Sequence, residues 1–142
     1  MKTEMIQVPI LNPMYKFGED EQEYVPTDPL EAFVVVKRGL WVHKTVKDFN
    51  EVEPRGNWTI SVGPKKAKIL SFIPSQKMAL RIARALAASR LVDWTTTTDA
   101  LEWPTLLREI VKTLRTAILK ETWNENIKRL EALVEQGEEV KV

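Results

Sequence analysis

The sequence contains no cysteine and only one histidine, His43. Without cysteine, disulfide bonds and thiolate metal ligands are excluded. A transition-metal site would depend on His43 and scattered carboxylates, so we expect neither a metal nor another cofactor. His43 alternates with Trp41 and Thr45 in a β-like segment. We expect it to be a partly exposed strand residue rather than a ligand or a general base.

The motifs of common enzyme classes are also missing. The five glycines are scattered singly, and neither G-x-x-x-x-G-K-[ST] nor G-x-G-x-x-G occurs, which argues against a phosphate-cradling loop. No serine lies in a nucleophile-elbow pattern. The acidic run at residues 19–23 lacks the alternating oxygen ligands and the glycine of a calcium loop. We therefore predict no catalytic residues and a protein that is not an enzyme.

Long hydrophobic runs are absent as well. Spanning a bilayer takes about 18 or more consecutive apolar residues, and no run approaches that length. The apolar stretch near the N-terminus is interrupted by Pro9 and Pro13, which makes it a poor secretory signal. We expect a cytoplasmic protein that does not contact membranes. Its 142 residues, 44% of them hydrophobic, suit one globular domain.

The net charge is only +1, but the charges are segregated along the chain. Residues 1–36 hold two Lys/Arg and seven Asp/Glu, a net charge of −5. Residues 37–90 hold twelve against three, a net charge of +9, and residues 91–142 hold seven against ten, a net charge of −3. Either the acidic ends fold back and neutralise the middle, or the middle presents a positive surface to a partner.

The first half of the chain predicts strands. Residues 1–30 contain four prolines and the acidic run, so we expect an extended acidic arm with at most one short strand, at residues 5–10. Residues 33–46 are rich in β-branched and aromatic side chains and predict two strands. The turn between them lies at Arg38-Gly39, where we expect Gly39 to adopt the positive φ.

A second hairpin and a helix should follow. Apolar and polar residues alternate over residues 58–62, which indicates a strand. Lys65 and Lys66 lie in the turn that follows, and residues 68–73 form the returning strand. Ser75 is a good N-cap for a helix that ends near Ser89. The apolar stripe of that helix consists of Ala79, Ile82, Ala83 and Leu86.

The C-terminal third predicts one bent helix or two separate helices. Pro104 suits a helix start, and Gly137 suits a helix end. Apolar residues on either side of residue 120 point in directions about 220° apart on one straight helix. A capping-box pattern at Thr122–Glu125 slightly favours a break there.

The predicted fold class is therefore α+β: an antiparallel sheet of about four strands, followed by one packed helix and one or two C-terminal helices. We expect the C-terminal helices on the opposite face of the sheet or in a dimer. All 142 residues form a single domain in this prediction. It comprises the arm at 1–30, a ββββα core at 31–90 and C-terminal helices at 99–137.

The leading functional prediction is a small binding protein that contacts DNA or RNA through a basic surface. Cations in turns extend from the fold and can meet phosphates, and six such contacts to a duplex would give a salt slope of roughly −5. Trp41, which has cations on both sides in the sequence, is a candidate platform for stacking an unpaired base. The predicted nucleic-acid-binding residues are Lys37, Arg38, Trp41, Lys44, Lys65, Lys66, Lys68, Lys77, Arg81 and Arg84.

The alternative prediction is a regulatory or assembly subunit that binds another protein or forms a homodimer. Five tryptophans are many for this length, and aromatic residues favour interface cores. The second C-terminal stripe needs a surface to pack against, which is either the sheet or a twin subunit. The predicted partner interface consists of Trp123, Ile127, Leu130 and Val134.

Overall fold

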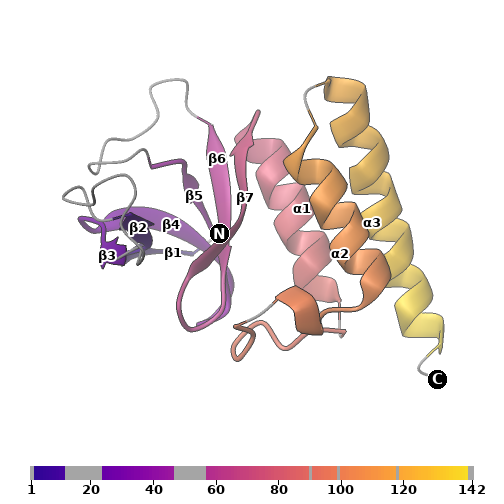
Figure 1. Ribbon diagram of the computed structural model, residues 1–142, viewed down its shortest axis with the longest axis horizontal. Coiled ribbons are helices and arrows are strands. Elements are labelled where there is room, and N and C mark those ends of the chain that lie inside the picture. The colour runs from indigo at the N-terminus through magenta and orange to yellow at the C-terminus, as the bar shows by residue number, and fades with distance from the viewer. Residues whose placement is uncertain are drawn as a thin grey trace, which may run out of the picture.

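The computed structural model describes residues 2–11, 24–46, 57–89, 91–98, 100–117 and 119–140. Within these residues the chain forms an antiparallel five-stranded sheet, a separate two-stranded ribbon and three α-helices (Figure 1). The α+β class predicted from the sequence is confirmed. The acidic run at 19–23 lies outside the described residues.

The strand order of the main sheet is β1-β4-β5-β6-β7. Strands β4 and β5 form the first predicted hairpin, and β6 and β7 form the second. The fifth strand comes from the arm. That arm strand, β1, pairs with β4 and brings the N-terminal residues onto the edge of the core. The strands are β1 (Thr3–Ile6), β4 (Leu30–Val36), β5 (Leu40–Lys44), β6 (Trp58–Val62) and β7 (Ala67–Ile73).

The arm contains further structure that its prolines did not suggest. Strands β2 (Pro9–Leu11) and β3 (Tyr24–Pro26) form an antiparallel ribbon. Each strand places a proline where it lacks a ladder donor, which suits short edge strands. The single strand expected at residues 5–10 is thus replaced by the separate strands β1 and β2.

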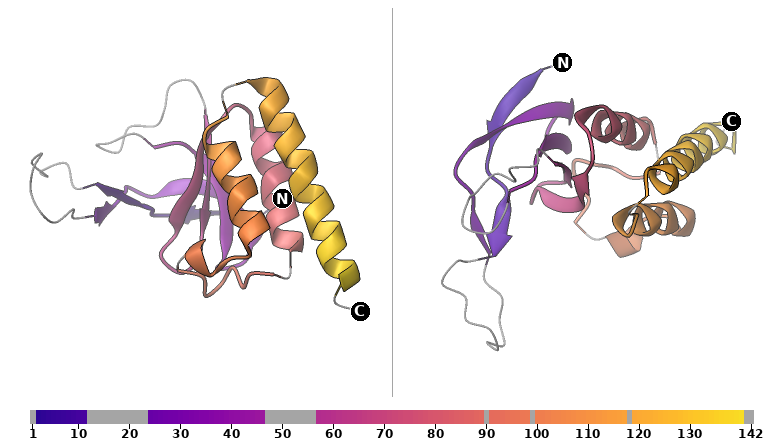
Figure 2. Two further views of the ribbon diagram at one scale, coloured as in Figure 1. Left: turned by 45° about the vertical axis from the view of Figure 1, so that its right-hand side comes forward. Right: turned by 90° about the horizontal axis from the view of Figure 1, so that it is seen from above.

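All three helices cover one face of the sheet (Figures 1 and 2). Helix α1 (Gln76–Ala88) contacts β4 to β7, and α2 (Thr105–Arg115) contacts β7. Helix α3 (Lys120–Val140) packs against both α1 and α2. The prediction that the C-terminal helices cover the opposite face is wrong, because their apolar stripes join the core that α1 already forms with the sheet.

The helix boundaries follow local signals in part. The Ser75 hydroxyl accepts a hydrogen bond from the backbone N–H of Met78 at 3.1 Å, so it is the N-cap of α1 as predicted. Helix α2 starts directly after Pro104. The C-terminal segment forms two helices, but α3 begins at Lys120, before the expected capping box, and continues past Gly137.

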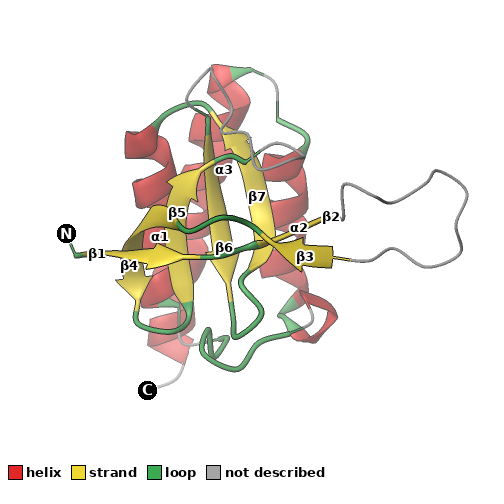
Figure 3. Cartoon of the chain, turned by 90° about the vertical axis from the view of Figure 1, so that its left-hand side faces the viewer, coloured by secondary structure: helices red, strands yellow, loops and turns green. Residues whose placement is uncertain are grey.

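The opposite face of the sheet is covered by the β2–β3 ribbon (Figure 3). A small apolar cluster forms between the arm and the sheet, where Ile6, Val8, Ala32 and Trp41 are buried. Farther along this face, β5 and β6 present polar side chains that are buried as well. The arm therefore packs against the sheet of the same chain, and the sheet face that it covers has little hydrophobic surface.

Two glycines let a loop lie against the hairpin turns. A Cβ on Gly39 would stand 2.9 Å from the carbonyl carbon of Trp94, and a Cβ on Gly63 would stand 2.2 Å from the carbonyl oxygen of Thr97. Gly63 has a φ of +78°, whereas the positive φ in the first turn belongs to Arg38 rather than Gly39. Gly39 is thus required for close approach, which corrects the expectation for that turn.

The tryptophans of this loop region fasten it to the helices. The indole N–H of Trp94 donates to the carbonyl oxygen of Leu86 at 2.8 Å, and that of Trp103 donates to the Thr97 hydroxyl at 2.8 Å. The two rings meet edge to face with centroids 5.3 Å apart. Both hairpin turns therefore pack against the loop at residues 94–97, which Trp94 anchors in the core.

Within the described residues, no helix combines the length and the apolar composition needed to cross a bilayer.

Candidate nucleic-acid interface

The two hairpin turns bring cations from separate parts of the sequence together. Lys37 and Arg38 lie in the β4–β5 turn, and Lys65 and Lys66 lie in the β6–β7 turn. The backbone N–H of Gly63 donates to the carbonyl oxygen of Gly39 at 2.8 Å, so the turns are neighbours at one end of the sheet. We call these four side chains and Lys68, which follows in β7, the hairpin cations.

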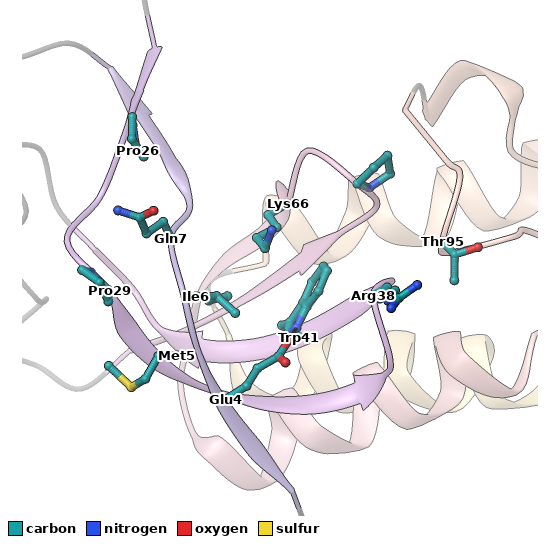
Figure 4. Close-up of a pocket in the computed structure, with 11 residues that line it drawn as sticks. Glu4, Met5, Ile6, Gln7, Pro26, Pro29, Arg38, Trp41, Lys66 and Thr95 are labelled. Atoms are coloured by element: carbon teal, nitrogen blue, oxygen red, sulfur yellow. Dashed lines mark hydrogen bonds between the residues drawn. The ribbon is translucent and has the colours of Figure 1, made fainter.

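A cavity of about 850 Å³ opens beside the turns (Figure 4). Arg38 and Lys66 line it next to Trp41, whereas Gln7, Pro26 and Pro29 lie away from these cations. Within the part of the chain that the structure describes, no acidic side chain forms an ion pair with any of the hairpin cations. The residues that line this cavity are Glu4, Met5, Ile6, Gln7, Pro26, Pro29, Arg38, Trp41, Pro64, Lys66 and Thr95.

Trp41 is held in place at the floor of this cavity. Its side chain is only 3% exposed. The indole N–H donates to Oε1 of Glu4 at 2.5 Å, and the Lys66 ammonium lies 5.3 Å from the ring centroid. The expectation of an open stacking platform is therefore wrong for this conformation, because the arm and Lys66 cover the ring.

A second cavity, of about 750 Å³, lies between the ribbon and the β6–β7 hairpin. Lys65 and Lys68 line it together with Ile10 and Tyr24 of the ribbon. Four of the hairpin cations thus line these two cavities: Arg38 and Lys66 the first, and Lys65 and Lys68 the second.

The three cations of α1 belong to a different surface. Lys77, Arg81 and Arg84 line a groove of about 500 Å³ between α1 and α3, in the helix layer. Nη2 of Arg81 lies 2.6 Å from Oε1 of Glu131, and this bond raises the pKa of the guanidinium. Glu135 lines the same groove, so α3 supplies acids that partly neutralise this face.

Lys44 stands apart from both groups. It ends β5, at the opposite end of the strand from the turn that holds Lys37 and Arg38. The ten residues predicted from the sequence therefore do not form one continuous surface. The structure brings together Lys37, Arg38, Lys65, Lys66 and Lys68 around a buried Trp41, and it separates Lys44 and the α1 cations from them.

The predicted partner interface lies inside the chain's own core. Trp123, Ile127, Leu130 and Val134 are all buried, and they pack in the same cluster as α1 and α2. This stripe of α3 already has its surface, so it is not available to a second chain. Trp94 and Trp103 are buried too, so neither these two tryptophans nor this stripe is available to form a dimer.

The buried polar face of the sheet centres on His43. The structure buries this side chain, which corrects the expectation of partial exposure. Its Nδ1 lies 2.8 Å from the carbonyl oxygen of Lys44, and its Nε2 lies 2.8 Å from the Ser61 hydroxyl. A carbonyl oxygen only accepts, so Nδ1 carries the proton and Nε2 accepts from Ser61. Burial lowers the pKa of His43 and keeps the ring neutral.

A serine next to a neutral histidine resembles an activated nucleophile, but the surroundings do not suit catalysis. Ser61 is 0% exposed. The adjoining cavity has a volume of about 20 Å³, which is room for about one water molecule. Thr45 and Thr59 form a separate hydroxyl–hydroxyl bond of 2.8 Å on the same face. The His43–Ser61 pair satisfies buried polar groups beneath the ribbon and leaves no space for a substrate.

Several residues that line the larger cavity gave no signal in the sequence. Glu4, Met5 and Gln7 lie in or beside β1, and Thr95 lies in the loop that braces the turns. Glu4, Met5 and Gln7 lie far before the basic segment at residues 37–90, and Thr95 follows it. The apolar residues of the arm indicated that it packs on its own domain, but nothing in their spacing indicated which face it covers.

Among the described residues, no group of three or more histidine, aspartate or glutamate side chains is placed to hold a metal ion. Comparisons of the chain with protein-family models, with curated proteins and with solved structures found no match.

Proposed function

We propose that the protein binds nucleic acid through the hairpin cations, with the phosphate backbone as the principal ligand. One observation carries the proposal. Two neighbouring turns place four cations at one end of the sheet next to a cavity, and none of them forms an ion pair in the described part of the chain. The one acid in the cavity lining, Glu4, is bonded to the Trp41 indole. Cations in exposed turns meet phosphates at little desolvation cost, whereas the α1 cations already face acids across their groove.

The charge arrangement predicts a defined salt dependence. If all five hairpin cations contact phosphates, the slope of log affinity against log salt is about −3.5 for a single strand and about −4.5 for a duplex. Each value is smaller in magnitude than a ten-residue surface would give. The slope therefore reports how many cations take part.

Fluorescence anisotropy with labelled single-stranded and duplex DNA and RNA tests the proposal. The affinity is measured at about 50 mM and at about 200 mM salt. Binding at the lower concentration that weakens steeply at the higher one supports the proposal. An absence of binding to all four probes at low salt contradicts it. Binding that ignores salt would also contradict it, because phosphate contacts release counterions.

A further inference from the structure

The larger cavity has two chemically different ends. Arg38 and Lys66 supply positive charge near Trp41, where the Glu4 carboxylate also lies, whereas Met5, Pro26 and Pro29 supply neutral, largely apolar surface (Figure 4). A ligand that fills it needs an anionic group joined to a mostly apolar body. Its volume of about 850 Å³ lies within the range of about 300–1,000 Å³ typical of small-ligand pockets.

We propose that this cavity accepts an unpaired base of single-stranded nucleic acid, with the adjoining phosphate at Arg38 and Lys66. The inference rests on the proposed function, and it adds that the site selects single strands over duplexes. Bases in a duplex are stacked inside the helix and cannot enter a cavity at the protein surface, whereas the bases of a single strand can be splayed out.

The neutral end also offers fixed polar atoms for the edge of a base. The Gln7 amide nitrogen donates to the carbonyl oxygen of Thr27 at 2.9 Å, which orients the side chain with its carbonyl oxygen as a further acceptor. At the other end of the cavity, the Glu4 carboxylate is held by its bond to the Trp41 indole (Figure 4). These contacts form in the chain itself, so the cavity wall is organised before a ligand arrives, and ordering it costs little.

Lys66 links the two ends of the cavity. Its ammonium lies over the Trp41 ring, 5.3 Å from the centroid. A phosphate beside Arg38 attracts the same ammonium, because a phosphate oxygen offers a stronger partner than a ring face. Binding of the phosphate therefore draws Lys66 toward the backbone, whereas Trp41 stays buried against the arm.

Two labelled probes with equal charge test the base contact. One is a short oligothymidine strand and the other is a strand of the same length in which every nucleotide is abasic. At low salt we expect the oligothymidine to bind about fivefold more tightly, the low end of what one stacked base contributes, because the base would contact the apolar wall at Met5 rather than an open ring. Equal affinities would overturn the base site and leave the proposed function intact. If neither strand binds, both proposals fail.

A variant pair locates the contact. Met5 is 62% exposed and lines the neutral end, so Met5→Ser should reduce the preference for oligothymidine and leave the affinity for the abasic strand unchanged. Leu119→Ser is the matched control, because Leu119 is equally exposed at 63% and does not line the cavity. If Met5→Ser retains the full preference, or if Leu119→Ser loses it, the base does not occupy this cavity.

Discussion

Two groups of basic residues in this molecule, the hairpin cations and the cations of α1, differ in what surrounds them. The hairpin cations lie in two turns and at the start of β7, and none of them forms an ion pair among the described residues. Arg38 and Lys66 share their cavity with one acid, Glu4, which is bonded to the Trp41 indole. The α1 cations form a regular helical stripe, yet α3 lies alongside with Glu131 and Glu135. Regular spacing along one element therefore says little about free charge, because an element distant in sequence decides whether that charge is neutralised.

The difference also extends to the supporting structure. The hairpin turns depend on a loop that packs under two glycines, and Asp93 stabilises that loop by accepting hydrogen bonds from the Thr95 hydroxyl and N–H. These bonds lower the pKa of Asp93. The α1 stripe needs only its own helix and the side chains of α3. Changes in the loop should thus affect one basic region and spare the other.

The largest effect is expected from Gly63→Ala, which would break the hairpin end. The new Cβ would stand 2.2 Å from the Thr97 carbonyl oxygen at a positive φ, so the free energy of unfolding should fall by about 2–4 kcal/mol. Urea denaturation measures the change. Gly39→Ala is the comparison and should cost less, about 1–2 kcal/mol, because its closest approach is 2.9 Å. Equal and negligible losses would show that the loop does not brace the turns.

A pair of double variants tests the comparison directly. Replacing Arg38 and Lys66 by alanine should weaken single-strand binding about tenfold at low salt and make the salt slope shallower by about 1.4, the contribution of two phosphate contacts. Replacing Lys77 and Arg84 removes the same charge from the α1 groove and should leave both values close to those of the unmodified protein. Equal losses in the two variants would mean that only total charge matters.

A third prediction concerns the buried polar face between the ribbon and the sheet. Burial lowers the pKa of His43 from its ordinary value of 6.5, so below about pH 6.5 the unfolded chain binds a proton that the folded chain does not. Stability should therefore be complete above that pH and fall as the pH drops, by at most about 1.4 kcal/mol per pH unit. Urea midpoints at several pH values measure this. His43→Gln should flatten the decline, and a decline that persists unchanged would assign it to other groups.

The smallest effect is expected from Arg81→Ala. Its bond to Glu131 is partly exposed to solvent, and such pairs contribute about 0.2–1 kcal/mol to stability. Thermal unfolding at low and high salt measures the loss, which should shrink with salt. Nucleic-acid binding should be unaffected, and a clear loss of affinity would place the α1 groove in the interface after all.

Much of the local structure could be predicted because it depends on neighbours in the chain. The alternation at 58–62 indicated β6, the Ser75 hydroxyl marked the start of α1, and Pro104 marked the start of α2. Hydrogen bonding and side-chain period act over a few residues, so their signals are present in any single sequence. Lys65 and Lys66 were recognised as turn lysines for the same reason.

The placement of the elements was decided only by the tertiary structure. Helices α2 and α3 join α1 on one face because their stripes complete a single core, and this removed Trp123 and its neighbours from the candidate interface. The arm covers the other face, which buries Trp41 and His43 and builds the cavity wall from Met5 and Gln7. The sequence by itself determined which segments form strands and helices and where the positive charges occur. Which of those charges remain uncovered depended on contacts between distant segments, since burial and charge pairing are properties of the packed chain.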